Sequence, residues 1–355
     1  MPERAVVLGV ESSCDETSCA VVVNGREVLS NIVASQIDMH SRFGGVVPEI
    51  ASRAHIEAVN TVIQEAMDKA GVAVAELSAV GVTHEPGLIG SLLIGLMAAK
   101  TLAWIWDVPL VGVNHVYAHA YAANLQAEPV QYPAVALICS GGHTALYHCH
   151  GPTEMTLLGT TIDDAAGEAF DKVASVLNLG YPGGPIVDRI ARAGNPEAVR
   201  FPRSLLSGQS LDFSFSGIKT AVLYHVNGVP GARKAVATTE VTAGGHGVAA
   251  MSQQEIADVA ASFQAAVVDV LKTKVRRAVK QTAARSIIIG GGVAANTALR
   301  QGLAELAEKL RVQLRMPEFR FCLDNAAMTA GLAYHLLREG KTSGLDLDAR
   351  ATVKR

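Results

Sequence analysis

Residues 5–23, AVVLGVESSCDETSCAVVV, decide the fold of this chain. An apolar run at residues 5–10 predicts a buried strand, the polar segment 11–17 predicts a turn, and a second apolar run at residues 20–23 predicts the next strand. Hydroxyl groups and backbone amides in such a turn can face a phosphate, and Asp15 can organise a cation or a water molecule. An ordinary polar hairpin has the same pattern, so this stretch alone leaves both interpretations open.

The second half of the chain repeats this plan. Residues 134–139 predict a strand, the segment SGGHT at residues 140–144 predicts a glycine-rich turn, and residues 145–148 predict the following strand. Glycines in that turn let the backbone approach a phosphate and offer its N–H groups. The repeat predicts an α/β fold with two lobes of duplicated topology around a nucleotide cleft, the actin-like ATPase architecture that Hsp70 and the sugar kinases share.

The proline-containing segment 128–133 is the best candidate for a linker. We therefore predict an N-terminal lobe at residues 1–130 and a C-terminal nucleotide-binding lobe at residues 131–325. A last segment, residues 326–355, is expected to return to the N-terminal lobe as a helix and to end in a polar tail. Residues 228–247 are rich in glycine, alanine and threonine, which predicts a mobile surface insertion.

Two long helices are predicted in the first lobe. Apolar residues recur at helical spacing over residues 49–70, a pattern typical of a core helix or of a surface for a partner helix. Residues 88–106 are apolar almost throughout and predict a buried helix, whose small residues allow close backbone packing. The most apolar run, residues 88–99, is shorter than the roughly 20 residues that span a bilayer.

The composition is that of a globular protein without an overall positive charge. Of the 355 residues, 49% are hydrophobic and 18% are charged, and the formal net charge is -3. A nucleic-acid partner therefore needs a local basic patch or a helper protein. The five cysteines are odd in number and form no CxxC pair, which argues for reduced thiols. Because the first residues show no signal-peptide pattern, the sequence predicts a soluble cytoplasmic protein.

The histidines of the stretch Asn114–His119 are the strongest candidates for metal ligands. His115 and His119 are four residues apart, so on a helix both imidazoles lie on one face. A pair of buried structural histidines has the same spacing. Two features favour a metal: the pair follows a strand-like run, where α/β proteins place their sites, and Asp324 offers a third ligand. Val116 stands where a zinc protease needs its glutamate.

Two further segments have features of a nucleotide site. The predicted helix at residues 161–178 begins with acidic residues that the helix dipole explains, but Asp171 lies in mid-helix, where the dipole does not explain it. A predicted strand at residues 286–289 runs into three glycines, residues 290–292, and then Asn296, which together suit an adenine or ribose wall. The glycines also fit a dinucleotide fingerprint, but too little chain follows for a full mononucleotide-binding half, and no acidic residue follows a second strand at the needed spacing.

Taken together and in order, these motifs resemble the TsaD family, whose members transfer a threonylcarbamoyl group to a tRNA adenosine beside the anticodon. The resemblance runs from about Val6 to Met328 and departs from the family pattern at two places. The first departure is Glu85, which replaces the first glycine of a Gly-Pro-Gly turn. The second is at Ile138 and Cys139, which occupy the place of a tyrosine metal ligand of archaeal and eukaryotic relatives. Because that ligand is missing, we expect more water or substrate around the metal. The shared motifs are Glu11–Thr17, Gly44–Glu49, His115 with His119, Ser140–Thr144, Ile162–Lys172, Tyr181–Pro185, Phe213–Lys219, Gly291–Val293 with Asn296, and Asp324–Asn325.

The resemblance implies an actin-like ATPase fold and a set of site residues. His115, His119 and Asp324 would hold one divalent metal ion, with Fe2+ as the first candidate and Zn2+ as the second. Asp15 and Glu16 would lie at the reaction centre as catalytic residues. The residues that would bind threonylcarbamoyl-AMP, ATP or ADP in the cleft are Ile138, Cys139, Ser140, Gly141, Gly142, Asp171, Gly184, Asp188 and Asn296.

The reaction that the resemblance implies is metal-assisted. The threonylcarbamoyl group would pass from threonylcarbamoyl-AMP to the N6 amine of the adenosine next to the anticodon, in tRNAs that read ANN codons. The implied partners are tRNA, a TsaB-like paralogue on the N-terminal lobe, a TsaE-like ATPase, and a TsaC-type enzyme that makes the adenylate. A basic cluster near Arg276, in a position that is usually a solvated helix end, is a candidate tRNA contact.

Three other functions share part of this pattern. A sugar- or acetate-type kinase of the same architecture would have the same phosphate turns but no evident need for the histidine pair. A metalloprotease would need the glutamate that is missing after His115. A non-enzymatic scaffold would leave three metal-type residues, drawn from distant segments, without a role.

Overall fold

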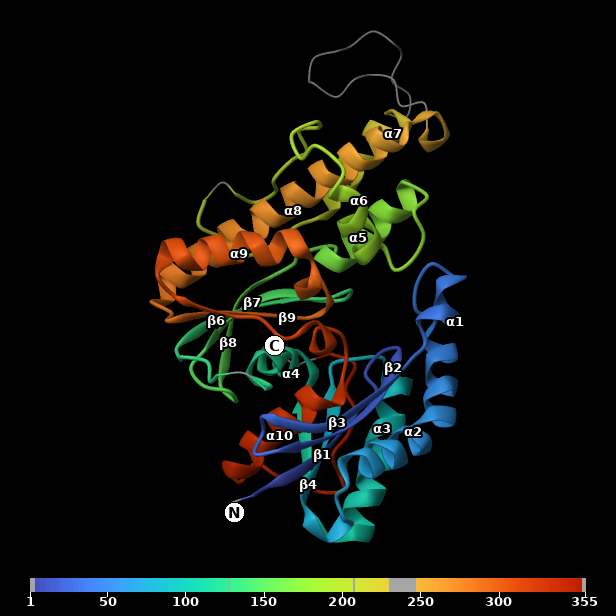
Figure 1. Ribbon diagram of the computed structural model, residues 1–355, viewed down its shortest axis with the longest axis vertical. Coiled ribbons are helices and arrows are strands. Elements are labelled where there is room, and N and C mark those ends of the chain that lie inside the picture. The colour runs from blue at the N-terminus through green and yellow to red at the C-terminus, as the bar shows by residue number, and fades with distance from the viewer. Residues whose placement is uncertain (1–3, 127, 207, 230–246, 353–355) are drawn as a thin grey trace.

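The computed structural model describes residues 4–126, 128–206, 208–229 and 247–352 (Figure 1). The insertion predicted at 228–247 lies almost wholly outside these residues. The strands are β1 Val6–Glu11, β2 Glu16–Val23, β3 Glu27–Ser35, β4 Leu77–Glu85, β5 Leu110–Asn114, β6 Ala134–Cys139, β7 Thr144–Cys149, β8 Met155–Thr160, β9 Ser286–Gly290 and β10 Gln313–Arg315. The helices are α1 Ile37–Ser41, α2 Pro48–Ala70, α3 Ile89–Trp106, α4 His115–Tyr121, α5 Ala166–Val176, α6 Gly183–Ala191, α7 Ser216–Asn227, α8 Gln253–Thr282, α9 Thr297–Leu310 and α10 Ala326–Arg338.

The two five-stranded sheets are built on one plan. The first has the strand order β3-β2-β1-β4-β5, and the second, in the same sense, has the order β8-β7-β6-β9-β10. In each sheet the first strand in the chain pairs antiparallel with the next strand and parallel with a much later one: β1 with β2 and β4, and β6 with β7 and β9. This duplicated topology confirms the predicted two-lobed α/β fold, with one sheet in each half of the molecule (Figure 1).

Helices cover both faces of the first sheet. The side chains of β1 that alternate to one face pack against α2 and α3, and those of the other face pack against α10. Two glycines admit α10 closely: a Cβ on Gly9 would lie 2.4 Å from the carbonyl oxygen of Ala326, and one on Gly81 would lie 2.5 Å from the Cβ of Ala333. The last helix therefore packs on the sheet that begins the chain. Domain boundaries at residues 130 and 325 stay a prediction.

Helix α4 lies between the two halves of the molecule (Figure 1). It contacts β4, β5 and α10 on one side and β6 and β9 on the other. Its apolar residues Val116 and Ala120 pack with Ala136 and Ile288 of the second sheet. Any side chain on the remaining face of this short helix is thus held where the two sheets meet.

The helix predicted at residues 161–178 begins later than expected, at Ala166. Thr161 forms a β-bridge with Phe213 instead. The carboxylate of Asp163 accepts hydrogen bonds from the backbone N–H groups of Phe215 at 2.8 Å and Ser216 at 3.3 Å, so it caps the start of α7. Long-range bonds therefore compete successfully with the first helical turn.

The prediction that residues 88–106 form a buried helix is half right. The helix α3 is present and its inner face packs on β4 and α2. Its outer face is exposed, with Met97 at 55% and Trp104 at 71% of full exposure. Within the described residues α3 is the one helix long and apolar enough to cross a membrane by length and composition, but its packing makes it a helix of the folded first half.

Candidate active site

Local sequence sets the position of the two histidines. Strand β5 ends at Asn114, whose side-chain oxygen accepts hydrogen bonds from the N–H groups of Val116 at 3.0 Å and Tyr117 at 3.2 Å and so caps α4. His115 and His119 lie one turn apart on this helix and are 6% and 1% exposed. Their rings meet edge to face, with centroids 4.5 Å apart.

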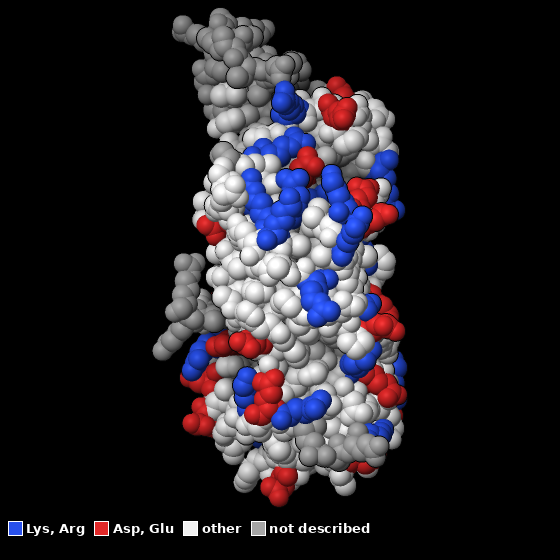
Figure 2. Space-filling model, turned by 90° about the vertical axis from the view of Figure 1, so that its left-hand side faces the viewer, with Lys and Arg blue, Asp and Glu red and all other residues white. Residues whose placement is uncertain are grey.

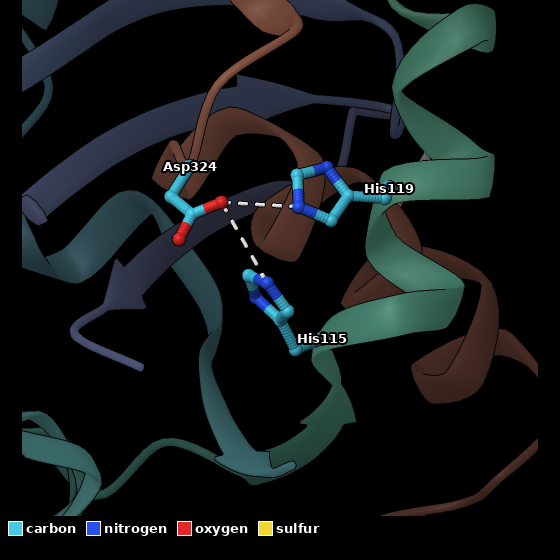
Figure 3. Close-up of side chains that lie close together, drawn as sticks. All are labelled: His115, His119 and Asp324. Atoms are coloured by element: carbon cyan, nitrogen blue, oxygen red, sulfur yellow. Dashed lines mark hydrogen bonds and ion pairs between the residues drawn. The ribbon is translucent and has the colours of Figure 1, made fainter. Parts of the chain in front are cut away.

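Asp324 reaches the same point from the other end of the chain, just before α10 begins (Figure 3). Its Oδ1 lies 3.0 Å from Nε2 of His119 and 3.6 Å from Nε2 of His115. One ligand atom of each of the three residues lies within 4.8 Å of the others. Two imidazoles and one carboxylate, all aimed at one point, fit a divalent metal ion and confirm that the three predicted residues come together.

The charges of the three groups are strongly coupled. Burial by itself would lower the pKa of His115, but the carboxylates of Asp324 and Glu11 outweigh it and raise that pKa to about 9. Burial would raise the pKa of Asp324, but the two histidines hold it well below its usual range. Without a metal ion, a proton on His115 therefore balances the carboxylates. Metal binding requires neutral imidazole, so it must release that proton.

The turn between β1 and β2 brings the predicted catalytic carboxylates to the same region. Asp15 is 8% and Glu16 is 7% exposed. Burial, together with the charges of Asp324 and Asp15, raises the pKa of Glu16 to about 9. Glu16 accepts a hydrogen bond from the hydroxyl of Ser35 at 3.1 Å. At neutral pH Glu16 is therefore a neutral acid beside Asp15.

The equivalent turn of the second half, between β6 and β7, presents backbone rather than side chains. A Cβ added to Gly141 or Gly142 would meet no heavy atom of the described residues within 4 Å, so both glycines border open space. Ile138 and Cys139 are 0% and 1% exposed, so their side chains belong to the core and do not border this space. The N–H of His143 donates to the hydroxyl of Ser140 at 3.1 Å and closes the turn.

The other predicted nucleotide residues make bonds within the second half. Asp171 accepts from the N–H of Gly183 at 2.7 Å, and Asp188 accepts from the hydroxyl of Thr297 at 2.8 Å. Asn296 caps α9 and donates to Gln264 at 2.7 Å. These bonds hold Asp171, Asp188 and Asn296 in place, and we call this part of the second half its wall. The bond to Gly183 also explains why Asp171 lies in mid-helix. Gly184 borders open space among the described residues. Ligand binding by these four residues stays a prediction.

Two residues near the metal triad were not singled out from the sequence. Burial and the charges of His115 and His119 lower the pKa of His143 to about 4, so a neutral imidazole from the second half lies near the triad. Glu11 is fully buried, and its Oε2 lies 3.3 Å from Nδ1 of His115. An acidic residue directly after a wholly buried strand was the signal for Glu11; nothing local distinguished His143.

Comparison with known proteins identifies the activity. Residues 27–331 match the profile of the TsaD family, described as tRNA N6-adenosine threonylcarbamoyltransferase. This chain belongs to that family. It is 46% identical over 354 residues to the tRNA N6-adenosine threonylcarbamoyltransferase of Clostridium beijerinckii, covering 99% of this chain and 98% of the relative. It is 50% identical over 346 residues to the one of Symbiobacterium thermophilum, covering 98% and 96%.

As a TsaD family member, the chain forms threonylcarbamoyladenosine by transfer of the threonylcarbamoyl group to a tRNA adenosine. The kinase, metalloprotease and scaffold alternatives therefore fall away. A solved structure of full-length HypF, in its phosphate- and nucleotide-bound form, resembles the fold with a TM-score of 0.60 at 12% identity, over 96% of this chain and 47% of that chain. This likeness supports the actin-like architecture and nothing beyond it.

Proposed function

We propose that the chain takes its threonylcarbamoyl group from threonylcarbamoyl-AMP and places it on the adenosine next to the anticodon in tRNAs that read ANN codons. The observation that supports this most directly is the convergence of His115, His119 and Asp324 beside the turns of both halves. The adenosine N6 forms a bond to the carbamoyl carbon, the bond from that carbon to the phosphate oxygen breaks, and AMP leaves with the electron pair.

The two turns would have different roles: the first would carry the catalytic side chains, and the second would bind the phosphate. Asp15 and Glu16 would act at the reaction centre, where Glu16 hydrogen-bonds to Asp15 and a carboxyl oxygen of Asp15 would accept the amine proton. The N–H groups around Gly141 and Gly142 would face the phosphate of the adenylate. The backbone of Ser140 and Cys139 would continue that contact.

The remaining nucleotide contacts would come from the wall of the second half. Asp171, Gly184, Asp188 and Asn296 would surround the ribose and adenine, with Ile138 contributing backbone from the end of β6. Their existing bonds support this role, because a wall that is already rigid loses little entropy when it binds a ligand.

We propose Fe2+ as the resident ion, with Zn2+ as the other candidate, held by His115, His119 and Asp324. A two-histidine, one-carboxylate set with open positions suits either ion. When bound, such an ion would act as a Lewis acid toward the carbamoyl or phosphate oxygens. The ligands come from α4 and from the segment before α10, so the ion would also brace the junction of the two halves.

A TsaB-like paralogue would dock on the outer side of α2 and α3. Exposed apolar side chains line it: Ile56 on α2 at 58% exposure, and Leu93, Met97 and Trp104 on α3 at 39%, 55% and 71%. Both helices contact the β1–β2 turn: Nε2 of His55 on α2 lies 3.0 Å from the carbonyl oxygen of Cys14, and the carbonyl oxygen of Ser91 on α3 accepts the hydroxyl of Ser12 at 2.8 Å. A partner here would thus bear on the reaction centre. A TsaE-like ATPase and a TsaC-type enzyme would complete a cytoplasmic pathway.

The C-terminal half of α8 is the surface we propose for tRNA. Lys272, Arg276 and Lys280 follow each other at four-residue steps and share one side of the helix. Figure 2 shows Lys and Arg side chains gathered on one face of the upper half of the molecule. With a formal net charge of -3 for the chain, binding of tRNA to this protein alone would be weak and sensitive to salt.

The test is transfer of labelled threonine to tRNA, with metal analysis on the same preparations. His119→Ala should lose the metal ion and lower transfer by about a thousandfold. His148→Ala is the matched control, because His148 lies on β7 and packs on His150 rather than on the triad. Full metal content together with full transfer in His119→Ala would show that the pair is structural and the proposed centre wrong.

A further inference from the structure

His115 has a second set of contacts that the metal centre does not use. Its Nε2 faces Asp324, while its Nδ1 lies 3.3 Å from Oε2 of Glu11 and 3.1 Å from Oγ of Ser13. Glu11 ends β1 and is 0% exposed. A carboxylate without solvent contact must be stabilised by hydrogen bonds from its neighbours, so every group around it matters.

The neighbours of Glu11 are donors. Its Oε1 accepts the backbone N–H of Ser13 at 2.6 Å. Its Oε2 accepts the hydroxyl of Thr83 at 2.6 Å and lies 3.4 Å from the hydroxyl of Thr329. An ionised carboxylate can only accept hydrogen bonds. The imidazole of His115 must therefore present a protonated Nδ1 to Glu11.

We propose that Glu11 is a positioning residue for metal binding, which accepts the Nδ1–H of His115 and leaves its Nε2 bare beside Asp324. The proposal rests on the metal centre proposed above. A ligating histidine that donates its other N–H to a carboxylate keeps one tautomer and one ring orientation, and it is the stronger base. His119 differs, since its buried Nδ1 has no hydrogen-bond partner among the described residues.

The same carboxylate also ties together the elements that carry the ligands. Thr83 lies on β4, Thr329 on α10 and His115 on α4. Thr329 follows Asp324 by five residues, so the bond network around Glu11 reaches the third ligand through α10. Glu11 thus fixes the histidine ring and also the spacing between the two segments from which the ligands project.

The first test measures Zn2+ affinity by competition with a chromophoric chelator, on the full chain and three variants. Glu11→Gln keeps the shape but introduces an amide NH2 among donors, so it should weaken Zn2+ binding about 10- to 100-fold while the circular dichroism spectrum is unchanged. Ser13→Ala should lose less. Parental affinity in Glu11→Gln, or an equal loss in Ser13→Ala, would overturn the role of Glu11.

His119→Ala separates this inference from the proposed centre. If Zn2+ does not bind the parent, or binds His119→Ala equally well, the metal centre itself is wrong. If His119→Ala loses Zn2+ and folded Glu11→Gln does not, only the role of Glu11 fails.

A second measurement needs no variant and so decides the case in which Glu11→Gln does not fold. Long-range nitrogen–proton NMR spectra of the Zn2+-loaded, 15N-histidine-labelled parent should show His115 protonated at Nδ1. A proton-free Nδ1 on that ring would overturn the proposal.

Discussion

The turn between β1 and β2 and the turn between β6 and β7 occupy equivalent places in two sheets of the same topology, but they are built differently. In the first turn the side chains of Glu11 and Ser12 are buried, and Oγ of Ser12 donates to the carbonyl oxygen of Ser91 at 2.8 Å. In the second turn Gly141 and Gly142 border open space. The first turn therefore holds polar side chains in fixed contacts, and the second leaves open space beside its backbone.

The largest expected effect is a loss of folding stability when a side chain is added at Gly291 in the second half. Gly291 has a φ of +85°, and a Cβ there would lie 2.4 Å from the carbonyl oxygen of Cys139. Gly291→Leu should lower the free energy of unfolding by about 2–6 kcal/mol, measured by chemical denaturation. Gly292→Leu is the control and should lose less, because its nearest neighbour is the flexible side chain of Leu323 at 3.2 Å. An unchanged denaturation midpoint for Gly291→Leu would contradict the packing described.

The second expected effect is a pH dependence specific to the first turn. Burial and two nearby carboxylates raise the pKa of Glu16 from 4.5 to about 9, so the folded chain keeps a proton that the unfolded chain releases. The stability from this proton is complete below pH 4.5 and is lost as the pH rises to about 9. Glu16→Gln should therefore gain stability relative to the parent between pH 5 and pH 9. The measurement is the free energy of unfolding of both proteins as a function of pH. The contribution of His115 cancels in the difference because both proteins share it. Parallel curves for the parent and for Glu16→Gln would contradict the prediction.

The third prediction concerns the open space at the second turn. Gly142→Leu should leave stability nearly unchanged but weaken AMP or ATP binding about 100-fold, about 2.7 kcal/mol, because the side chain would fill the space the phosphate needs. Isothermal calorimetry measures the affinity. Gly151→Leu is the matched control, since Gly151 also borders open space among the described residues but lies beyond the end of β7. Equal affinities for the two variants would mean that the turn does not contact the nucleotide.

The smallest expected effect is the difference in stability loss between two serine-to-alanine substitutions, one in each turn. Oγ of Ser12 donates to the carbonyl oxygen of Ser91 and accepts the N–H of Gly95 at 3.1 Å, so Ser12→Ala removes two buried hydrogen bonds and should cost about 1–3 kcal/mol. Ser140 makes one such bond, to the N–H of His143, and Ser140→Ala should cost about 1 kcal/mol or less. The comparison uses thermal unfolding of both variants. If Ser140→Ala were the more damaging, the contrast between the two turns would be reversed.

Much of the architecture was readable from local pattern. Alternation of apolar runs with polar or glycine-rich turns predicted both strand–turn–strand units, and helical spacing predicted α2 closely. Local pattern failed where distant contacts took over. Asp163 serves α7 rather than its own helix, and the apolar stripe of α3 points outward at Trp104. Hydrophobicity marks a surface that avoids water, but it does not say whether the chain itself covers that surface.

The sequence by itself determined which groups this protein could use: a histidine pair at helical spacing, a late aspartate, two phosphate-type turns and an ordered set of family motifs. Those are properties of residue type and spacing, which local geometry preserves. Only the tertiary structure decided that Asp324 lies 3.0 Å from His119, that Glu11 supports His115 from behind, and that Gly141 borders open space while Gly291 does not. These facts depend on how α4, α10 and the two sheets pack, because close packing between segments far apart in the chain fixes distances that no local pattern contains.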